Sequence, residues 1–169
     1  KIKYMNFFKS FKNKFFSKEL GIVLILIIFI FALDRVTKLG IINHQLSNSS
    51  LFVNNFLNLE LVWNTGIGFG LFSQNANIYY HATSLVIFLV ILYLIYLINK
   101  ANLVEKILFT LILGGALGNF YDRVVYFAVP DFIDFHIDNF HWFTFNIADI
   151  FITIGIILII AKDLISNKK

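Results

Sequence analysis

A polar stripe in the last apolar stretch of the chain carries the residue types best suited to chemistry. In FNIADIFITIG, Asn146, Asp149 and Thr153 are spaced to lie on one face of a helix whose other faces are apolar. An acidic residue in such a frame is costly to keep and is a candidate for function, although an aspartate hydrogen-bonded to its neighbours can also be structural. We expect the Asp149 carboxyl group to act as a general acid or base.

The preceding segment, VPDFIDFHIDNFHW, offers Asp131, Asp134 and Asp138 as partners for Asp149. Two carboxyl groups that share a proton can work together, as in aspartic proteases: one accepts a proton from water while the other protonates the departing amine. Residue type and spacing leave the three aspartates nearly equivalent.

The same segment contains His136 and His141, which could bind a metal together with a nearby aspartate. The chain has no cysteine, which excludes thiolate zinc sites and a cysteine nucleophile. The H-x4-H spacing matches no strong ligand signature. We therefore expect no metal and no cofactor, and we expect both histidines to be solvated side chains at the membrane interface.

Another polar face is predicted in GGALGNFYDRV, where Gly115, Asn119 and Arg123 follow one another at i, i+4 spacing with Asp122 beside them. The guanidinium group of Arg123 can hold a backbone carbonyl or a carboxylate. An Asp122–Arg123 network that only fixes the helices is an equally good interpretation for Asp122.

Asp34 and Lys38 stand four residues apart, so they share a helical face and can pair with each other. We favour an interfacial anchor over a catalytic role for this pair.

The composition places all these residues in a membrane protein. Of the 169 residues, 59% are hydrophobic and 14% are charged, which leaves too little polar surface to coat a soluble globule. We expect a single domain over residues 1–169, an all-α polytopic membrane protein with a basic tail at 1–19. The apolar runs predict four transmembrane helices, at about 21–42, 78–98, 103–121 and 147–161.

The segments between these spans, 43–77 and 122–146, are expected outside the cytoplasm. Within residues 51–72, Leu57, Leu59 and Leu61 alternate with polar residues, which favours a short strand over a fifth span. Gly66, Gly68 and Gly70 then predict a turn, and Gly114 and Gly118 have the small-xxx-small spacing of closely packed helices.

The charges predict the orientation. The two tails and the 99–106 loop hold eleven basic and three acidic residues, a net charge of +8, whereas the opposite side holds three basic and seven acidic residues, a net charge of −4. By the positive-inside rule both termini are cytoplasmic. The basic balance is thus a topology signal, and we expect no nucleic-acid partner.

Several segments together resemble the lipoprotein signal peptidases, or type II signal peptidases. They occur in the family's order and run from the first predicted span to the fourth; the GNxxDR and FNxAD segments are the most specific. The similar segments are LDRVTK (33–38), NTGIGFG (64–70), GGALGNFYDRV (114–124), VPDFIDF (129–135) and FNIADIFITIG (145–155).

The resemblance implies a metal-independent aspartyl endopeptidase of the bacterial inner membrane that cleaves diacylglyceryl-modified prolipoproteins before the lipidated Cys. It also implies a small extracytoplasmic β-rich cradle matching 51–72, contact with membrane lipid and an active site at the outer face; we expect a monomer. It selects Asp131 and Asp149 as the catalytic pair. The substrate-binding residues it implies are Asn64, Asn119, Arg123 and Asn146, and the supporting residues are Asp34, Lys38, Gly66, Gly118 and Asp122.

Three positions depart from the usual family pattern. Trp63 stands where Arg is common, Gly68 where Ala is usual, and Pro130 replaces an aliphatic residue before Asp131. Pro130 fixes its own φ and restricts Val129, so it can stiffen the approach to Asp131.

A non-enzymatic alternative is a small proton or cation carrier that uses Asp34, Asp122 and Asp149 as relay groups. All three acids are predicted at or beyond the outer membrane boundary, which leaves the inner half of every span without an acidic relay. A third alternative is a metal hydrolase built on His136 and His141.

Overall fold

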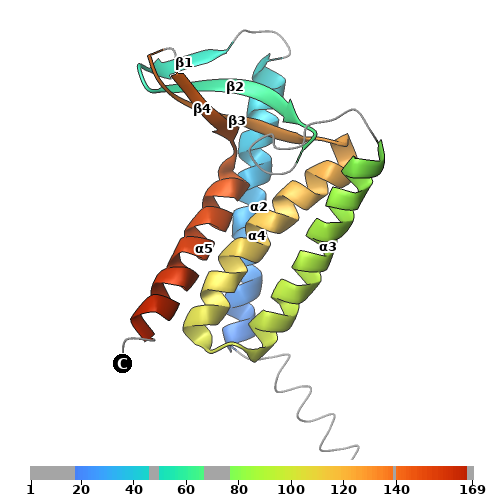
Figure 1. Cartoon of the computed structure of the whole chain (residues 1–169), viewed down its shortest axis with the longest axis vertical. Helices are drawn as coiled ribbons and strands as arrows, with labels where there is room; N and C mark the ends of the chain where they lie inside the picture. Colours follow the sequence, from blue (N-terminus) through green and yellow to red (C-terminus); the bar gives the residue numbers. More distant parts are fainter. Residues whose placement is uncertain (1–17, 46–49, 67–76, 139, 167–169) are drawn as a thin grey trace, which may run out of the picture.

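The computed structural model describes residues 18–45, 50–66, 77–138 and 140–166. A bundle of helices carries a small β-sheet at one end (Figure 1). The elements in chain order are α2 (Lys18–Gln45), β1 (Leu51–Asn54), β2 (Leu57–Asn64), α3 (Asn77–Lys100), α4 (Leu103–Tyr126), β3 (Val129–Ile137), β4 (Phe140–Phe145) and α5 (Ile147–Ser166).

Three helices in the described part of the chain are long and apolar enough to cross a membrane: α2, α4 and the Tyr80–Lys100 portion of α3. Their outward faces carry large apolar side chains such as Ile25 and Val86, which are 69% and 59% exposed. Such an apolar surface is unfavourable in water and is typical of contact with lipid. The fourth predicted span corresponds to α5, which is also apolar but carries charged residues at both ends.

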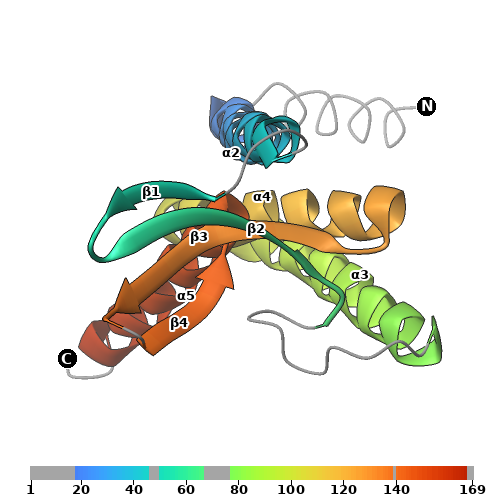
Figure 2. The ribbon, with the colours of Figure 1, turned by 90° about the horizontal axis from the view of Figure 1, so that it is seen from above.

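Helix α4 is the centre of the bundle and packs against α2, α3 and α5 (Figures 1 and 2). It begins with a capping box between Asn102 and Glu105. Its glycines allow neighbouring helices to approach closely, as the sequence predicts. A methyl group on Gly118 would lie 2.6 Å from Oδ2 of Asp34, and one on Gly115 would collide with the carbonyl oxygen of Ala148.

The four strands form one antiparallel sheet in the order β1-β2-β3-β4. Gln45, the last residue of α2, attaches this sheet to the bundle: its side-chain amide donates to Leu59 O (3.2 Å) and accepts from Leu61 N (2.7 Å). The register of β2 shifts against β3 at this place, between Leu59 and Val62. The Gln45 side chain therefore supplies hydrogen-bond partners to the backbone of β2 where the β2–β3 ladder is interrupted.

The strand expected within 51–72 is confirmed for residues 51–64, where it forms the β1–β2 hairpin. Gly68 and Gly70 lie outside the described residues. Expecting strand structure only there was incomplete, because β3 and β4 supply half of the sheet. The helices also extend beyond the predicted spans: α2 reaches Gln45 and α4 reaches Tyr126.

Candidate active site

Asp149 is the third residue of α5 and is held by a reciprocal pair of hydrogen bonds with Asn146. The backbone N–H of Asn146 donates to Asp149 Oδ2 (3.1 Å), and the backbone N–H of Asp149 donates to Asn146 Oδ1 (3.1 Å). This is the pattern of a helix capping box, with an aspartate in the position that usually holds glutamate. The start of α5 therefore fixes the position of the Asp149 carboxylate.

Asp131 lies in the buried part of β3 and accepts hydrogen bonds from two amide side chains. Asn146 Nδ2 donates to Asp131 Oδ1 (2.6 Å), and Asn64 Nδ2 donates to Oδ2 (2.9 Å). Burial and the nearby charge of Asp149 raise the pKa of Asp131 to about 7, although the two amides favour the ionised form. The group can therefore exchange its proton near neutral pH.

Asn146 connects the two carboxyl groups. Its side-chain NH₂ group binds Asp131 while its backbone N–H binds Asp149, and the residue is fully buried. The β4–α5 junction thus holds a carboxyl group from a strand and one from a helix in a single network. Such an arrangement suits a proton shared between two acids.

Asn119 contacts Asp149 from the opposite helix. Its Nδ2 atom donates to Asp149 Oδ1 (2.8 Å), and its Oδ1 atom accepts from Lys38 Nζ (2.9 Å). The predicted polar face of α4 is therefore directed at Asp149 and at α2.

Behind Asn119 lies a buried group of two acids and two bases. Lys38 Nζ donates to Asp34 (2.8 Å) and Asp122 (2.7 Å), and Arg35 pairs with Asp122 at 2.5 Å. The predicted Asp34–Lys38 pair is thus confirmed, but both side chains are fully buried and do not form an exposed interfacial anchor. The two acidic and two basic side chains of the group balance each other in charge, because an unpaired buried charge would be strongly destabilising.

The Asp34 carboxylate also supports the start of α5, because Oδ1 accepts from the backbone N–H of Ala148 (3.1 Å). That N–H group has no partner within its own helix. The charged group in α2 and α4 is thereby connected to the helix that carries Asp149.

Arg123 and Asp122 do not pair in the way that the alternative interpretation proposed. Asp122 pairs with Lys38 and Arg35, whereas the guanidinium group of Arg123 donates to the carbonyl oxygen of Gly66. The separation follows from the helix, since adjacent residues point about 100° apart. The prediction that Arg123 can hold a backbone carbonyl is confirmed.

The Arg123 contact orders the chain after β2. The Asn64 side chain accepts from Gly66 N (2.9 Å) in a tight local turn, which directs its NH₂ group at Asp131. The Tyr80 hydroxyl donates to the carbonyl oxygen of Arg123 (2.6 Å), and its ring lies below the guanidinium group. Residues 64–66 and the end of α4 thus form one wall beside Asp131.

Two residues of this environment were missed by sequence reasoning, Arg35 and Tyr80. Arg35 precedes Lys38 by three residues, which places it on the same helical face, and this spacing could have indicated it. Tyr80 follows a segment outside the described residues, and no spacing signal links it to Arg123.

The other candidate aspartates lie elsewhere. Asp134 binds His141, with Oδ2 2.8 Å from Nδ1. Asp138 is in the left-handed conformation (φ 51°) at the end of β3. The expectation of solvated histidines is wrong for His136, which is buried, while the His141 side chain is half exposed.

The two described departures from the family pattern face each other: Trp63 of β2 is the register partner of Pro130 of β3. Trp63 also contacts the ring of Tyr126, with centroids 5.6 Å apart. Pro130 cannot donate a ladder hydrogen bond. The contact between the rings of Trp63 and Tyr126 adds side-chain packing at that place.

An apolar cavity of about 430 Å³ opens between the sheet and α5 and reaches Asp149. Aromatic side chains of β3 and β4 form one wall and aliphatic side chains of α5 the other. The lining residues are Phe135, Trp142, Phe143, Phe145, Asp149, Ile150, Thr153 and Ile154.

Comparison with known proteins identifies the family of the chain. A family model described as signal peptidase (SPase) II matches residues 26–165. The chain belongs to the signal peptidase II family. It is 49% identical over 152 residues to a lipoprotein signal peptidase of Pelagibacter ubique (strain HTCC1062), covering 89% of this chain and 90% of the relative. A lipoprotein signal peptidase of Francisella tularensis subsp. mediasiatica (strain FSC147) is 45% identical, with 86% and 92% covered.

The fold is also that of a solved bacterial membrane enzyme, determined by the in meso method at 2.3 Å resolution. The TM-score is 0.74 at 34% identity, with 88% of this chain and 92% of that chain covered. The resemblance to signal peptidase II is thus confirmed, and the chain is a signal peptidase of the membrane. The alternative of a proton or cation carrier has no support.

Proposed function

We propose that Asp131 and Asp149 are the catalytic pair of an aspartyl endopeptidase that removes the signal peptide from prolipoproteins, cutting before the Cys that carries diacylglyceryl. The observation that carries the proposal is the position of Asn146, which binds both carboxyl groups at once. The pKa of Asp131, raised to about 7, supports it because one of the two acids must hold a proton.

In this mechanism one carboxylate accepts a proton from water while the water oxygen attacks the peptide carbonyl carbon. The other carboxyl group donates its proton to the amide nitrogen as the carbon–nitrogen bond breaks. Both products leave without a covalent bond to the enzyme. Asn64 and Asn146 orient Asp131, Asn119 orients Asp149, and Arg123 holds the 64–66 wall along the substrate path.

The apolar cavity supports a lipid-bearing substrate. Its aromatic and aliphatic lining offers no charged partner except Asp149, which lies at its edge. Acyl chains would lie against Trp142, Phe143 and Ile154 while the peptide bond reaches the acids. Lipid on the substrate would thereby be the feature that the enzyme recognises.

We further propose that α5 is the fourth crossing and that the whole chain is one monomeric membrane domain of the bacterial inner membrane. The charge asymmetry supports cytoplasmic termini, with the sheet and both aspartates at the outer face. We assign supporting roles to Asp34, Lys38 and Asp122, whose ion pairs lie behind Asn119. Gly66 and Gly118 also have supporting roles, because Gly66 accepts the hydrogen bond from Arg123 and Gly118 leaves room for the Asp34 carboxylate.

The test is cleavage of a purified diacylglyceryl prolipoprotein by the full chain in detergent. Loss of the signal peptide is measured as a change in the mobility of the substrate on a gel. Asp131→Asn and Asp149→Asn should each lose more than about 1,000-fold in kcat/KM, because neither amide can exchange the proton. Asp138→Asn is the matched control, since Asn also tolerates a left-handed conformation. It should keep full activity.

Substrate lacking the diacylglyceryl group should be cleaved poorly or not at all, and EDTA should leave cleavage intact. Full activity in either active-site variant would refute the catalytic pair. Equal cleavage of unlipidated substrate would refute the lipid specificity, and loss with EDTA from a chain that stays folded would favour the metal hydrolase.

A further inference from the structure

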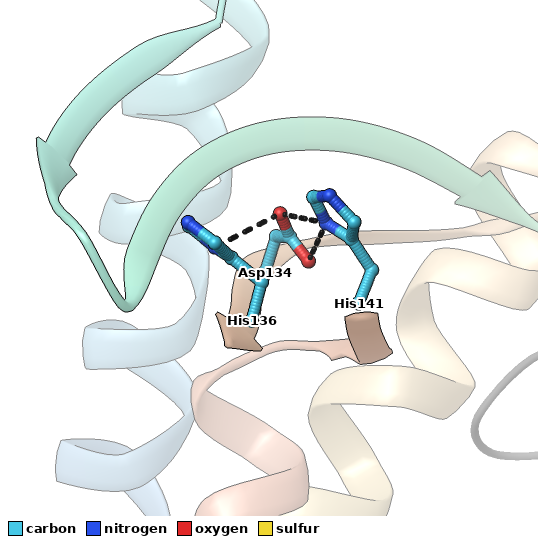
Figure 3. Close-up of side chains that lie close together, drawn as sticks. All are labelled: Asp134, His136 and His141. Carbon is cyan, nitrogen blue, oxygen red and sulfur yellow. Dashed lines mark hydrogen bonds and ion pairs between the residues drawn. The ribbon is translucent and has the colours of Figure 1, made fainter. Parts of the chain in front are cut away.

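The β3–β4 hairpin carries a second polar cluster that the peptidase mechanism does not use. Asp134, His136 and His141 each offer one ligand atom, and these atoms lie within 4.8 Å of one another. Figure 3 shows the carboxylate of Asp134 between the two imidazole rings. Two imidazoles and one carboxylate are a common protein ligand set for transition metals.

The strand register explains why these residues meet. Asp134 and His136 are two apart in β3, so both side chains are on its buried face. His136 is the register partner of His141 in β4, and the rings stack with centroids 5.0 Å apart. The H-x4-H spacing therefore spans a turn between two strands, which is why it matches no helical ligand motif.

The ring of His136 provides an independent observation. Its Nδ1 atom is buried and has no hydrogen-bond partner in the described part of the chain, and the residue is 9% exposed. The closest carboxylate atom, Asp134 Oδ2, lies 3.6 Å away, beyond hydrogen-bond reach. A buried ring nitrogen without a partner is costly, and a cation between it and Asp134 would provide one.

We propose that Asp134, His136 and His141 bind one divalent transition-metal ion, with zinc as the reference ion. Ligand atoms around a tetrahedral zinc ion are about 3.3 Å apart, given bonds of about 2.0–2.1 Å. The observed separations from Asp134 Oδ2, 3.6 Å to His136 and 2.8 Å to His141, lie on either side of that value. His141 is half exposed, so its ring can move outward and lengthen the shorter separation. With three protein ligands, one coordination position would stay open to water.

The ion would act as a clasp between β3 and β4. Strand β4 leads directly into Asn146 and α5, and β3 carries Asp131 three residues before Asp134. Crosslinking the strands stabilises the hairpin that carries Asp131 and leads into α5, which carries Asp149. It is a structural site, separate from the proton transfer.

The test uses the full chain purified without a histidine tag and stripped of metal. Isothermal titration with zinc chloride should show one ion per chain at micromolar affinity or tighter. His141→Ala and Asp134→Asn should each weaken binding at least tenfold, while His81→Ala, an exposed histidine on α3, should not change it. Zinc should also raise the thermal unfolding midpoint of the unaltered chain but not that of His141→Ala.

His141 is exposed enough for its variant to fold, and the unfolding midpoint without zinc verifies this. Copper(II) bound at the site should show the electron paramagnetic resonance signature of two imidazole nitrogens. No zinc uptake at 100 μM, or unchanged affinity in His141→Ala, would overturn the proposal. Neither result depends on peptidase activity, so the proposed catalytic pair would be unaffected.

Discussion

Lys38 donates a 2.9 Å hydrogen bond to the Oδ1 atom of Asn119. An ammonium group has no acceptor, so this contact determines which end of the Asn119 amide faces α2. The NH₂ group must then face Asp149, where it donates at 2.8 Å. Lys38 thus orients a donor to Asp149, the proposed catalytic acid, without touching that residue.

We predict that Lys38→Met destabilises the protein by about 3–5 kcal/mol, because Asp34 and Asp122 are then buried with a lost partner. The thermal unfolding midpoint in detergent, read from the fluorescence of the two tryptophans, measures the loss. Lys106→Met is the matched control, since its partner Glu19 is half exposed, and it should show a smaller loss. Equal losses would contradict the role of the buried group.

Asn119→Ala should lower kcat/KM about 10- to 100-fold with a small change in substrate affinity. It removes a hydrogen bond to a carboxylate, worth about 1.5–3 kcal/mol, and each 1.4 kcal/mol is about tenfold in rate. Steady-state cleavage of the lipidated substrate measures both parameters. Asn99→Ala, an exposed asparagine at the other end of the bundle, should retain full activity. A change confined to KM would indicate a role in binding.

Stability should fall as the pH rises toward 7, and Asp131 is the cause. Its pKa is raised from 3.8 to about 7 in the folded protein, so between these values the folded state binds more protons than the unfolded state. The contribution is fully present below pH 4 and is lost as the pH rises through 7. Unfolding midpoints from pH 5 to 8 measure it, and Asp131→Asn should reduce the slope. An unchanged slope would assign it to another group.

The helices were predictable because a long apolar run can adopt few structures other than a helix in a membrane. The strands β3 and β4 were not, although buried Asp134 and His136 alternate with exposed Phe135 and Ile137 at strand periodicity. Aromatic residues occupy the alternate positions as well, which concealed this alternation.

The choice of Asp131 over Asp134 and Asp138 came from the family resemblance alone. Spacing could not separate them, because the difference lies in partners that are distant in sequence. Asp131 meets Asn64 and Asn146, whereas Asp134 meets His141 across the hairpin. Such pairings require the strand register, which a single sequence does not contain.

Gly118 offers a test of how closely the bundle supports the site. A Cβ atom there would lie 2.6 Å from Asp34 Oδ2, so Gly118→Ala must displace a carboxylate that binds Lys38 and the N–H of Ala148. Overpacking of this kind costs about 1–3 kcal/mol. We expect a lower unfolding midpoint together with lower kcat/KM, because the start of α5 moves with Asp34.

The matched control is Gly40→Ala, which also lies within a helix but has nothing within 4 Å of the added methyl group. There the higher helix propensity of alanine should stabilise the protein by up to about 1 kcal/mol and leave kcat/KM unchanged. The two substitutions add the same atoms to the same kind of backbone, so opposite signs isolate the contact with Asp34. A neutral Gly118→Ala would mean that Asp34 can shift freely, and the connection from the buried charges to α5 would then be too loose to position Asp149.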